Sequence, residues 1–203
     1  MVLWQAGMIE TEVSVKAVAV LTELENHLTA AEFLQNMVFI NLNMNDREKV
    51  RRFSALSKLY SGIGFHRKAA FFLRVAAMRC VGPNNPHPDW PLCYSMLMDA
   101  NYGYSKFQQK DKSSAEAKGW PALQVQLMLE LVGTSRKMNR QEAAVIHVTR
   151  LLDLMFKHLT PNQLDDICKQ LSGIVGQLRS PEIKAHRHLA HLSGLVTNSI
   201  LFC

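Results

Sequence analysis

The chain has 203 residues, of which 48% are hydrophobic and 20% are charged. This composition is globular and excludes a wholly disordered chain, and no apolar run approaches the roughly 18 residues of a membrane-spanning helix. The formal net charge of +6 is concentrated in residues 47–80, which contain nine Lys and Arg and one acid. Such a basic block can contact phosphate, an anionic lipid surface or an acidic partner, or it can form a solvated helix face.

In chain order, hydrophobic spacing and helix-start signals predict helices throughout. The predicted helices span about residues 12–25, 30–43, 46–61, 66–81, 90–101, 119–138, 141–158, 162–178 and 182–200. Three pairs have the spacing of a capping box: Thr29 with Glu32, Asn45 with Glu48, and Asn139 with Glu142. Pro161 and Pro181 suit the first helical position. Because no run alternates apolar and polar residues between turns, we predict an all-α protein.

Residues 50–83 match the helix–turn–helix pattern of a tetratricopeptide repeat. The predicted packing positions are Phe53, Leu56, Ser57, Tyr60, Gly64, Ala69, Leu73 and Ala76. In this prediction the small residues let two helices approach, Phe53, Tyr60 and Leu73 fill the space beside them, and Gly64 lies in the turn. Weaker copies of the pattern precede and follow it. The predicted fold is therefore a tetratricopeptide-like α-solenoid of helical hairpins, with a generic helix bundle as the alternative.

No combination of side chains in the sequence predicts catalysis. Residues 62–68 lack the glycine and lysine spacing of a phosphate loop, and the adjacent Asp165 and Asp166 point about 100° apart on a helix. His186, His188 and His191 form the one histidine cluster, without a second pair at a zinc-finger spacing. We therefore predict no enzyme, no metal and no cofactor, and a helical enzyme that uses the histidine cluster is the weakest alternative.

The four cysteines show no pattern of a disulfide framework or a zinc site. They are Cys80, Cys93, Cys168 and Cys203, and none of them lies in a C-x-x-C pair. Reduced thiols in a cytoplasmic protein are the predicted state.

Two stretches resemble a known family. Residues 32–36 followed by 52–60, and above all the run from Ile63 to Val81, closely resemble the subunit-nine family of the trafficking protein particle (TRAPP) complex. Residues 119–126 and 130–132 also look like that family, and the resemblance covers about residues 13–172. The predicted organisation is an N-terminal extension (1–12), a TRAPP-subunit-like helical repeat region (13–172) with a degenerate loop at 84–118, and a divergent helical tail (173–203).

The resemblance implies a non-catalytic scaffold in a vesicle-tethering complex of the TRAPP II type. It implies ER-to-Golgi and intra-Golgi transport, other TRAPP complex subunits as partners, and indirect contact with Rab GTPases and Golgi membranes through the assembled complex. It also implies a link to NF-kappa-B pathway kinases. Since the family chain continues into further domains and this one stops after an apolar tail, we expect a fragment or a short isoform.

The basic block supplies the predicted interaction surface. The residues singled out are Arg47, Arg51, Arg52, Arg67 and Lys68. They would meet an acidic partner or a membrane surface. The alternative function is a helical-repeat module that binds nucleic acid or acts as a signalling adaptor through the same block, residues 47–80. Base-stacking aromatic residues are sparse near the block, which disfavours single-stranded nucleic acid as the ligand.

Overall fold

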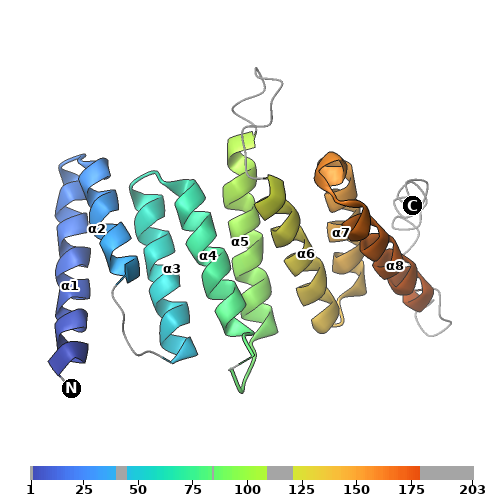
Figure 1. Cartoon of the computed structure of the whole chain (residues 1–203), viewed down its shortest axis with the longest axis horizontal. Helices are drawn as coiled ribbons and strands as arrows, with labels where there is room; N and C mark the ends of the chain where they lie inside the picture. The colour runs from blue at the N-terminus through green and yellow to red at the C-terminus, as the bar shows by residue number, and fades with distance from the viewer. Residues whose placement is uncertain (1, 40–44, 84, 109–120, 179–203) are drawn as a thin grey trace. The chain divides into compact units, whose positions relative to one another are not determined.

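The computed structural model describes residues 2–39, 45–83, 85–108 and 121–178. All regular secondary structure within these ranges is helical, which confirms the all-α prediction (Figure 1). The helices are α1 (Val2–Glu23), α2 (His27–Phe39), α3 (Asp46–Gly62), α4 (His66–Cys80), α5 (Trp90–Gln108), α6 (Pro121–Lys137), α7 (Gln141–Met155), a 3₁₀ turn (Phe156–His158) and α8 (Pro161–Leu178). The chain divides into two compact units, residues 1–109 and 110–203.

In the first unit, consecutive helices lie side by side and antiparallel, as a helical solenoid requires (Figure 1). Helices α1 and α2 form one hairpin, α3 and α4 form the next, and α5 packs against α4. One continuous apolar core joins α1 to α4. Its buried residues are Val18, Ala30, Ala31, Leu34, Met37, Leu56, Tyr60, Ile63, Ala69 and Phe72.

The α3–α4 hairpin is held together by stacked aromatic rings. The ring of Phe72 stacks on Tyr60, with centroids 5.3 Å apart, and on Phe53, with centroids 6.1 Å apart. Phe72, not Leu73, therefore fills the space beside Tyr60. Neighbouring positions on a helix point about 100° apart, so Leu73 is turned out of this core and is only half-buried.

Four of the other predicted packing residues are buried: Leu56, Ser57, Ala69 and Ala76. Gly64 occupies the turn between α3 and α4 with a φ of 81°, a left-handed conformation that strains other residues.

Helix α5 continues two turns beyond its predicted end at residue 101. A Cβ added at Gly103 would lie 3.0 Å from the Cβ of Ala70, so the glycine allows α5 to approach α4 closely. One residue later, Tyr104 is buried. Packing against α4 thus outweighs the weak helix propensity of this stretch.

Helix α1 also differs from its prediction. It begins at Val2, and no proline interrupts residues 2–12.

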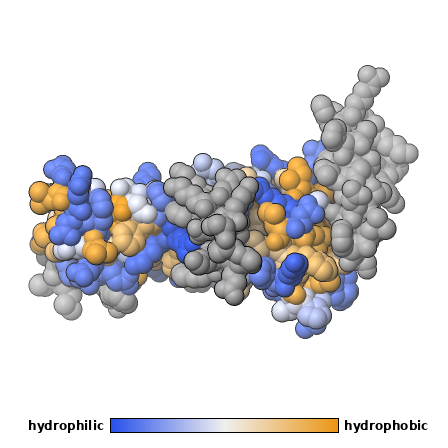
Figure 2. Space-filling view, turned by 90° about the horizontal axis from the view of Figure 1, so that it is seen from above, coloured by the Kyte–Doolittle hydropathy of each residue, from blue (hydrophilic) through white to orange (hydrophobic). Residues whose placement is uncertain are grey.

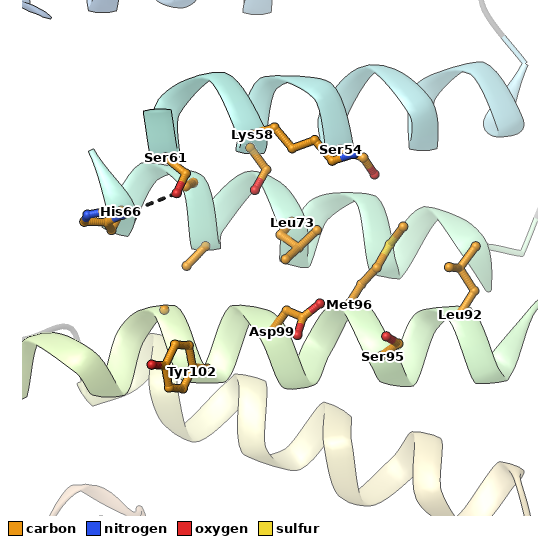
Figure 3. Close-up of a pocket in the computed structure, with 14 residues that line it drawn as sticks. Ser54, Lys58, Ser61, His66, Leu73, Leu92, Ser95, Met96, Asp99 and Tyr102 are labelled. Atoms are coloured by element: carbon orange, nitrogen blue, oxygen red, sulfur yellow. Dashed lines mark hydrogen bonds between the residues drawn. The ribbon is translucent and has the colours of Figure 1, made fainter. Parts of the chain in front are cut away.

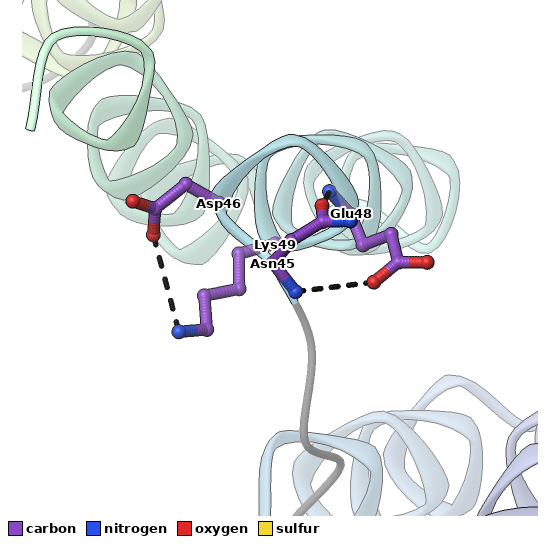
Figure 4. A network of polar contacts seen from close by, with 4 residues as sticks. All are labelled: Asn45, Asp46, Glu48 and Lys49. Carbon is purple, nitrogen blue, oxygen red and sulfur yellow. Dashed lines mark hydrogen bonds and ion pairs between the residues drawn. The ribbon is translucent and has the colours of Figure 1, made fainter. Parts of the chain in front are cut away.

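One of the three proposed capping boxes is present. The Asn45 side chain accepts a hydrogen bond from the Glu48 backbone N–H at 2.9 Å, and the Glu48 carboxylate accepts one from the Asn45 N–H at 3.1 Å (Figure 4). The other two predictions are wrong. Helix α2 already begins at His27, where the Asn26 side chain accepts from the Thr29 N–H. Asn139 has a φ of 57° and lies outside α7.

The second unit contains α6, α7 and α8. Helix α6 packs along α7, and α8 follows with a strongly one-sided apolar face. Ala144 and Val145 of α7 are buried with Ile174 of α8, and Val175 packs beside them. Pro161 is the first residue of α8, as predicted. The last predicted helix, 182–200, and Pro181 lie outside the described residues.

Two of the four cysteines, Cys80 and Cys93, are free and buried. Cys203 lies outside the described residues. Among the described helices there is no candidate for a membrane-spanning segment.

Candidate interaction groove

The first unit contains a groove of about 560 Å³ between α3 and α5, with α4 as its floor (Figure 3). Ser54, Ser57, Lys58 and Ser61 line the α3 side. Leu92, Ser95, Met96, Asp99 and Tyr102 line the α5 side. The groove exists because α4 contributes the small side chains of Ala69 and Ala70, which leave the space above the floor open.

A second cavity, of about 480 Å³, continues the groove toward the start of α3. Arg47 and Val50 of α3 line it, together with Pro86 and His87 of the loop before α5. Leu92 lines both cavities, so the two form one elongated depression along the hairpin. Because both walls are α-helices, the groove lies between rigid elements.

One side of α3 carries a row of cations, of which Lys58 lines the groove and Arg47 lines the second cavity. Arg47, Arg51 and Lys58 are four and seven residues apart in turn, a spacing that places them within about 40° of one another around the helix. All three side chains are exposed, and no acid among the described residues pairs with them. Of the acids of α3, Asp46 lines the second cavity and lies 3.9 Å from Lys49, and Glu48 caps the helix.

The opposite wall carries acids. Asp99 of α5 lines the groove without an ion-pair partner among the described residues. Asp89, just before α5, lines the second cavity, and its carboxylate accepts a hydrogen bond from the Leu92 N–H at 2.9 Å. Both signs of charge therefore line the two cavities: Arg47 and Lys58 as cations, and Asp46, Asp89 and Asp99 as acids.

The five residues of the predicted interaction surface do not share one face. Arg47 and Arg51 lie near the start of α3, and Arg67 and Lys68 begin α4. Since the two helices are antiparallel, these pairs lie at opposite ends of the hairpin, about 20 Å apart along the helix axis. Arg52 points away from the groove and is half-buried, and burial lowers the pKa of its guanidinium.

Lys68 has an aromatic contact away from the groove. Its ammonium lies 5.4 Å from the centroid of the Tyr60 ring and 5.9 Å from that of Phe65. These are cation–π distances, so the aromatic rings of the hairpin stabilise the ammonium group of Lys68.

The sequence analysis did not identify Lys58, Ser54 or Ser61 as residues of a groove. The signal that could have identified them is their spacing along one side of α3.

The groove offers no group prepared for covalent chemistry. Cys80 lines the end cavity, but burial raises the pKa of its thiol, and the Asp89 carboxylate raises it further. A protonated, buried thiol is a poor nucleophile. Within the described ranges no group of three His, Cys, Asp or Glu side chains is placed to hold a metal ion. The predicted histidine cluster, His186, His188 and His191, lies outside the described residues.

Hydrophobic side chains are also exposed at the α1–α2 end of the first unit (Figure 2). The exposed apolar residues there are Ile9, Val13, Val20, Leu24 and Leu28. Three of them, Ile9, Val13 and Val20, lie on one side of α1, since these positions recur at helical spacing. One side of α1 thus exposes an apolar stripe.

Antiparallel helical hairpins that pack one after another define the class: an all-α helical-repeat protein. Sequence comparison specifies it further. Over 168 residues, the chain is 46% identical to trafficking protein particle complex subunit 9 of Xenopus laevis and 45% identical to those of Mus musculus and Homo sapiens. This chain is homologous to a segment of that subunit.

The match covers 82% of this chain but only 15% of each of these relatives. The chain therefore spans a small part of the length of the curated relatives it matches. No protein-family model matches the chain, and neither does any solved structure.

Proposed function

We propose that this chain is a non-catalytic scaffold segment of a trafficking protein particle complex and acts by binding other subunits of that complex. The observation that carries the proposal is the identity of 44–46% to relatives named as subunit 9 of the complex. The helical hairpins and the open groove support a role in contact rather than in chemistry.

The finer role follows from the same proposal. The assembled complex would act in vesicle transport between the endoplasmic reticulum and the Golgi and within the Golgi, and it would activate Rab GTPases through other subunits. The chain would then be cytoplasmic and peripheral to Golgi membranes. Binding to NF-kappa-B pathway kinases stays a prediction.

Affinity purification tests the scaffold role. The full chain, tagged and expressed in animal cells, is expected to recover other trafficking protein particle subunits, which mass spectrometry identifies. Circular dichroism of the purified chain first establishes that it is helical. A full-length subunit 9 relative serves as the positive control. If the relative recovers the complex and the folded chain recovers none of it, the proposed function is wrong.

A further inference from the structure

We propose that the exposed apolar stripe of α1 is the docking site for an amphipathic helix of a partner protein, whose apolar side is bordered by lysine or arginine. The inference deepens the proposed scaffold function and rests on it, because the partner would belong to the same assembly. Three observations specify this partner: the uncovered stripe, the acids beside it, and the helical spacing of both.

Helix α1 is apolar on two opposite sides, and one of them is uncovered. Val18 is 1% exposed and belongs to the core that α1 shares with α2. Ile9, Val13 and Val20 are 63%, 57% and 55% exposed, and each points about 140–180° away from Val18 around the helix. A helix that is apolar all round is normally buried. The exposed stripe of α1 is therefore suited to contact with a further element.

Acidic side chains border this stripe on both edges. Glu12 and Glu23 lie on one edge and Glu10 on the other, each about 60–80° from its centre. Lys16 lies on the same side of α1, but its ammonium is 2.9 Å from the Glu12 carboxylate, so its charge is paired. Residues 2–39 contain five acids and one lysine, which is a net charge of −4. Cations on the partner would therefore complement the edges of the stripe.

The spacing of these residues fits a second helix. Ile9, Val13 and Val20 occupy positions d, a and a of a heptad, in which Glu10 and Glu12 fall at the flanking e and g positions. Charges at e and g select the partner when two helices pair. The stripe is about 17 Å long, which some three turns of a partner helix would cover. An extended segment would instead need backbone hydrogen bonds, which the apolar side chains of the stripe cannot supply.

The same charges disfavour two other occupants of the stripe. A second copy of this chain would bring a second acidic α1–α2 hairpin against the first, and like charges across an interface oppose association. A membrane surface rich in anionic lipid would be repelled in the same way. A helix bordered by lysine or arginine is attracted by the acids while its apolar side covers the stripe.

A peptide-binding measurement on the purified full chain tests the proposal. The probe is a fluorescein-labelled peptide of about three heptads with leucine at a and d and lysine at e and g, and fluorescence anisotropy reports its binding. A peptide with glutamate in place of lysine is the matched probe. The lysine peptide is expected to bind at least about tenfold more tightly. Because the whole chain has a net charge of +6, non-specific attraction would favour the glutamate peptide.

A double variant locates the site. Val13→Ser combined with Val20→Ser removes most of the stripe and preserves the helix, because serine and valine have similar helix propensities. It is expected to weaken binding of the lysine peptide about tenfold. Ile146→Ser combined with Leu154→Ser is the matched control, since both residues are exposed on α7, and is expected to leave binding within about twofold. Circular dichroism checks that both double variants remain helical.

Any of four outcomes would overturn the proposal. The first two are no preference for the lysine peptide and equal weakening by the two double variants. The third is sedimentation of the unchanged chain as a dimer that the Val13→Ser and Val20→Ser changes convert to a monomer, since a second copy would then occupy the stripe. The fourth is binding of phosphatidylserine vesicles that the same changes abolish.

The peptide measurement needs no other subunit, so its failure differs from failure of the proposed function. Affinity purification of the two double variants links the two. Loss of trafficking protein particle subunits by the Val13→Ser and Val20→Ser variant alone is expected. Equal recovery by both double variants, with peptide binding lost in the first, would overturn this proposal and leave the scaffold function standing.

Discussion

At the scale of single residues, the side of a helix to which a residue points matters more than its type. Phe71 and Phe72 are adjacent in sequence and identical in chemistry, yet Phe72 is 7% exposed and Phe71 is 37% exposed. Phe72 stacks between Tyr60 and Phe53, whereas Phe71 meets only the edge of Phe72 among the ring contacts of the hairpin. The pair therefore offers an internal comparison of core and surface.

Replacement of Phe72 by alanine is expected to lower the free energy of unfolding by about 3–5 kcal/mol, because it removes a buried ring and leaves a cavity between α3 and α4. Phe71→Ala is the matched control and is expected to cost less than about 1 kcal/mol. Urea unfolding followed by circular dichroism measures both variants. Equal losses would contradict the packing described for the hairpin.

At the scale of elements, helix ends depend on particular hydrogen bonds. Asn45 and Glu48 satisfy two backbone N–H groups at the start of α3, and Asn26 performs the corresponding role for α2. Thr29 and Glu32 have the same spacing as a capping box but lie inside α2. Spacing alone does not distinguish a cap from an interior position, because the chain can begin a helix one turn earlier when an alternative cap such as Asn26 is available.

Asn45→Ala is expected to lower the free energy of unfolding by about 1 kcal/mol, since the N–H of Glu48 loses its acceptor. Thr29→Ala is expected to have little effect or to stabilise slightly, because alanine has the higher helix propensity at an interior position. The midpoint of urea unfolding compares the two variants. A larger loss at Thr29 than at Asn45 would show that the caps are assigned wrongly.

At the scale of the whole molecule, the net charge of +6 is less informative than its distribution. Within the α3–α4 hairpin, Arg47 and Arg51 lie at one end, and Arg67 and Lys68 at the other. Arg52 is half-buried and faces away from the groove. A nucleic-acid surface requires cations that follow one phosphate backbone, and these five residues of the predicted surface do not provide such a track.

The full chain is therefore expected to leave labelled single-stranded RNA and double-stranded DNA unshifted in a gel at physiological salt, and any shift at low salt should disappear steeply as salt rises. The Arg67→Glu variant controls for general electrostatic attraction. A shift that persists at physiological salt and is weakened by both Arg67→Glu and Lys58→Glu would revive the nucleic-acid alternative.

Much of this fold is encoded locally and can be predicted. Hydrophobic spacing placed the α3–α4 hairpin to within one residue at each helix end, and the capping box at Asn45 and the glycine turn at Gly64 marked its start and its turn. These are properties of short stretches, since helical periodicity, caps and left-handed turns each depend on residues within a few positions of one another.

The tertiary structure alone decided the rest. Whether Phe72 or Leu73 enters the core depends on the rotation of α4 against α3, and the extension of α5 depends on the contact of Gly103 with Ala70. The groove itself consists of residues some forty positions apart, such as Lys58 and Asp99. Sequence by itself determined where helices form, because that free energy is local. Which charged side chains face one another across a groove follows from how the helices pack, and that free energy is shared among distant residues.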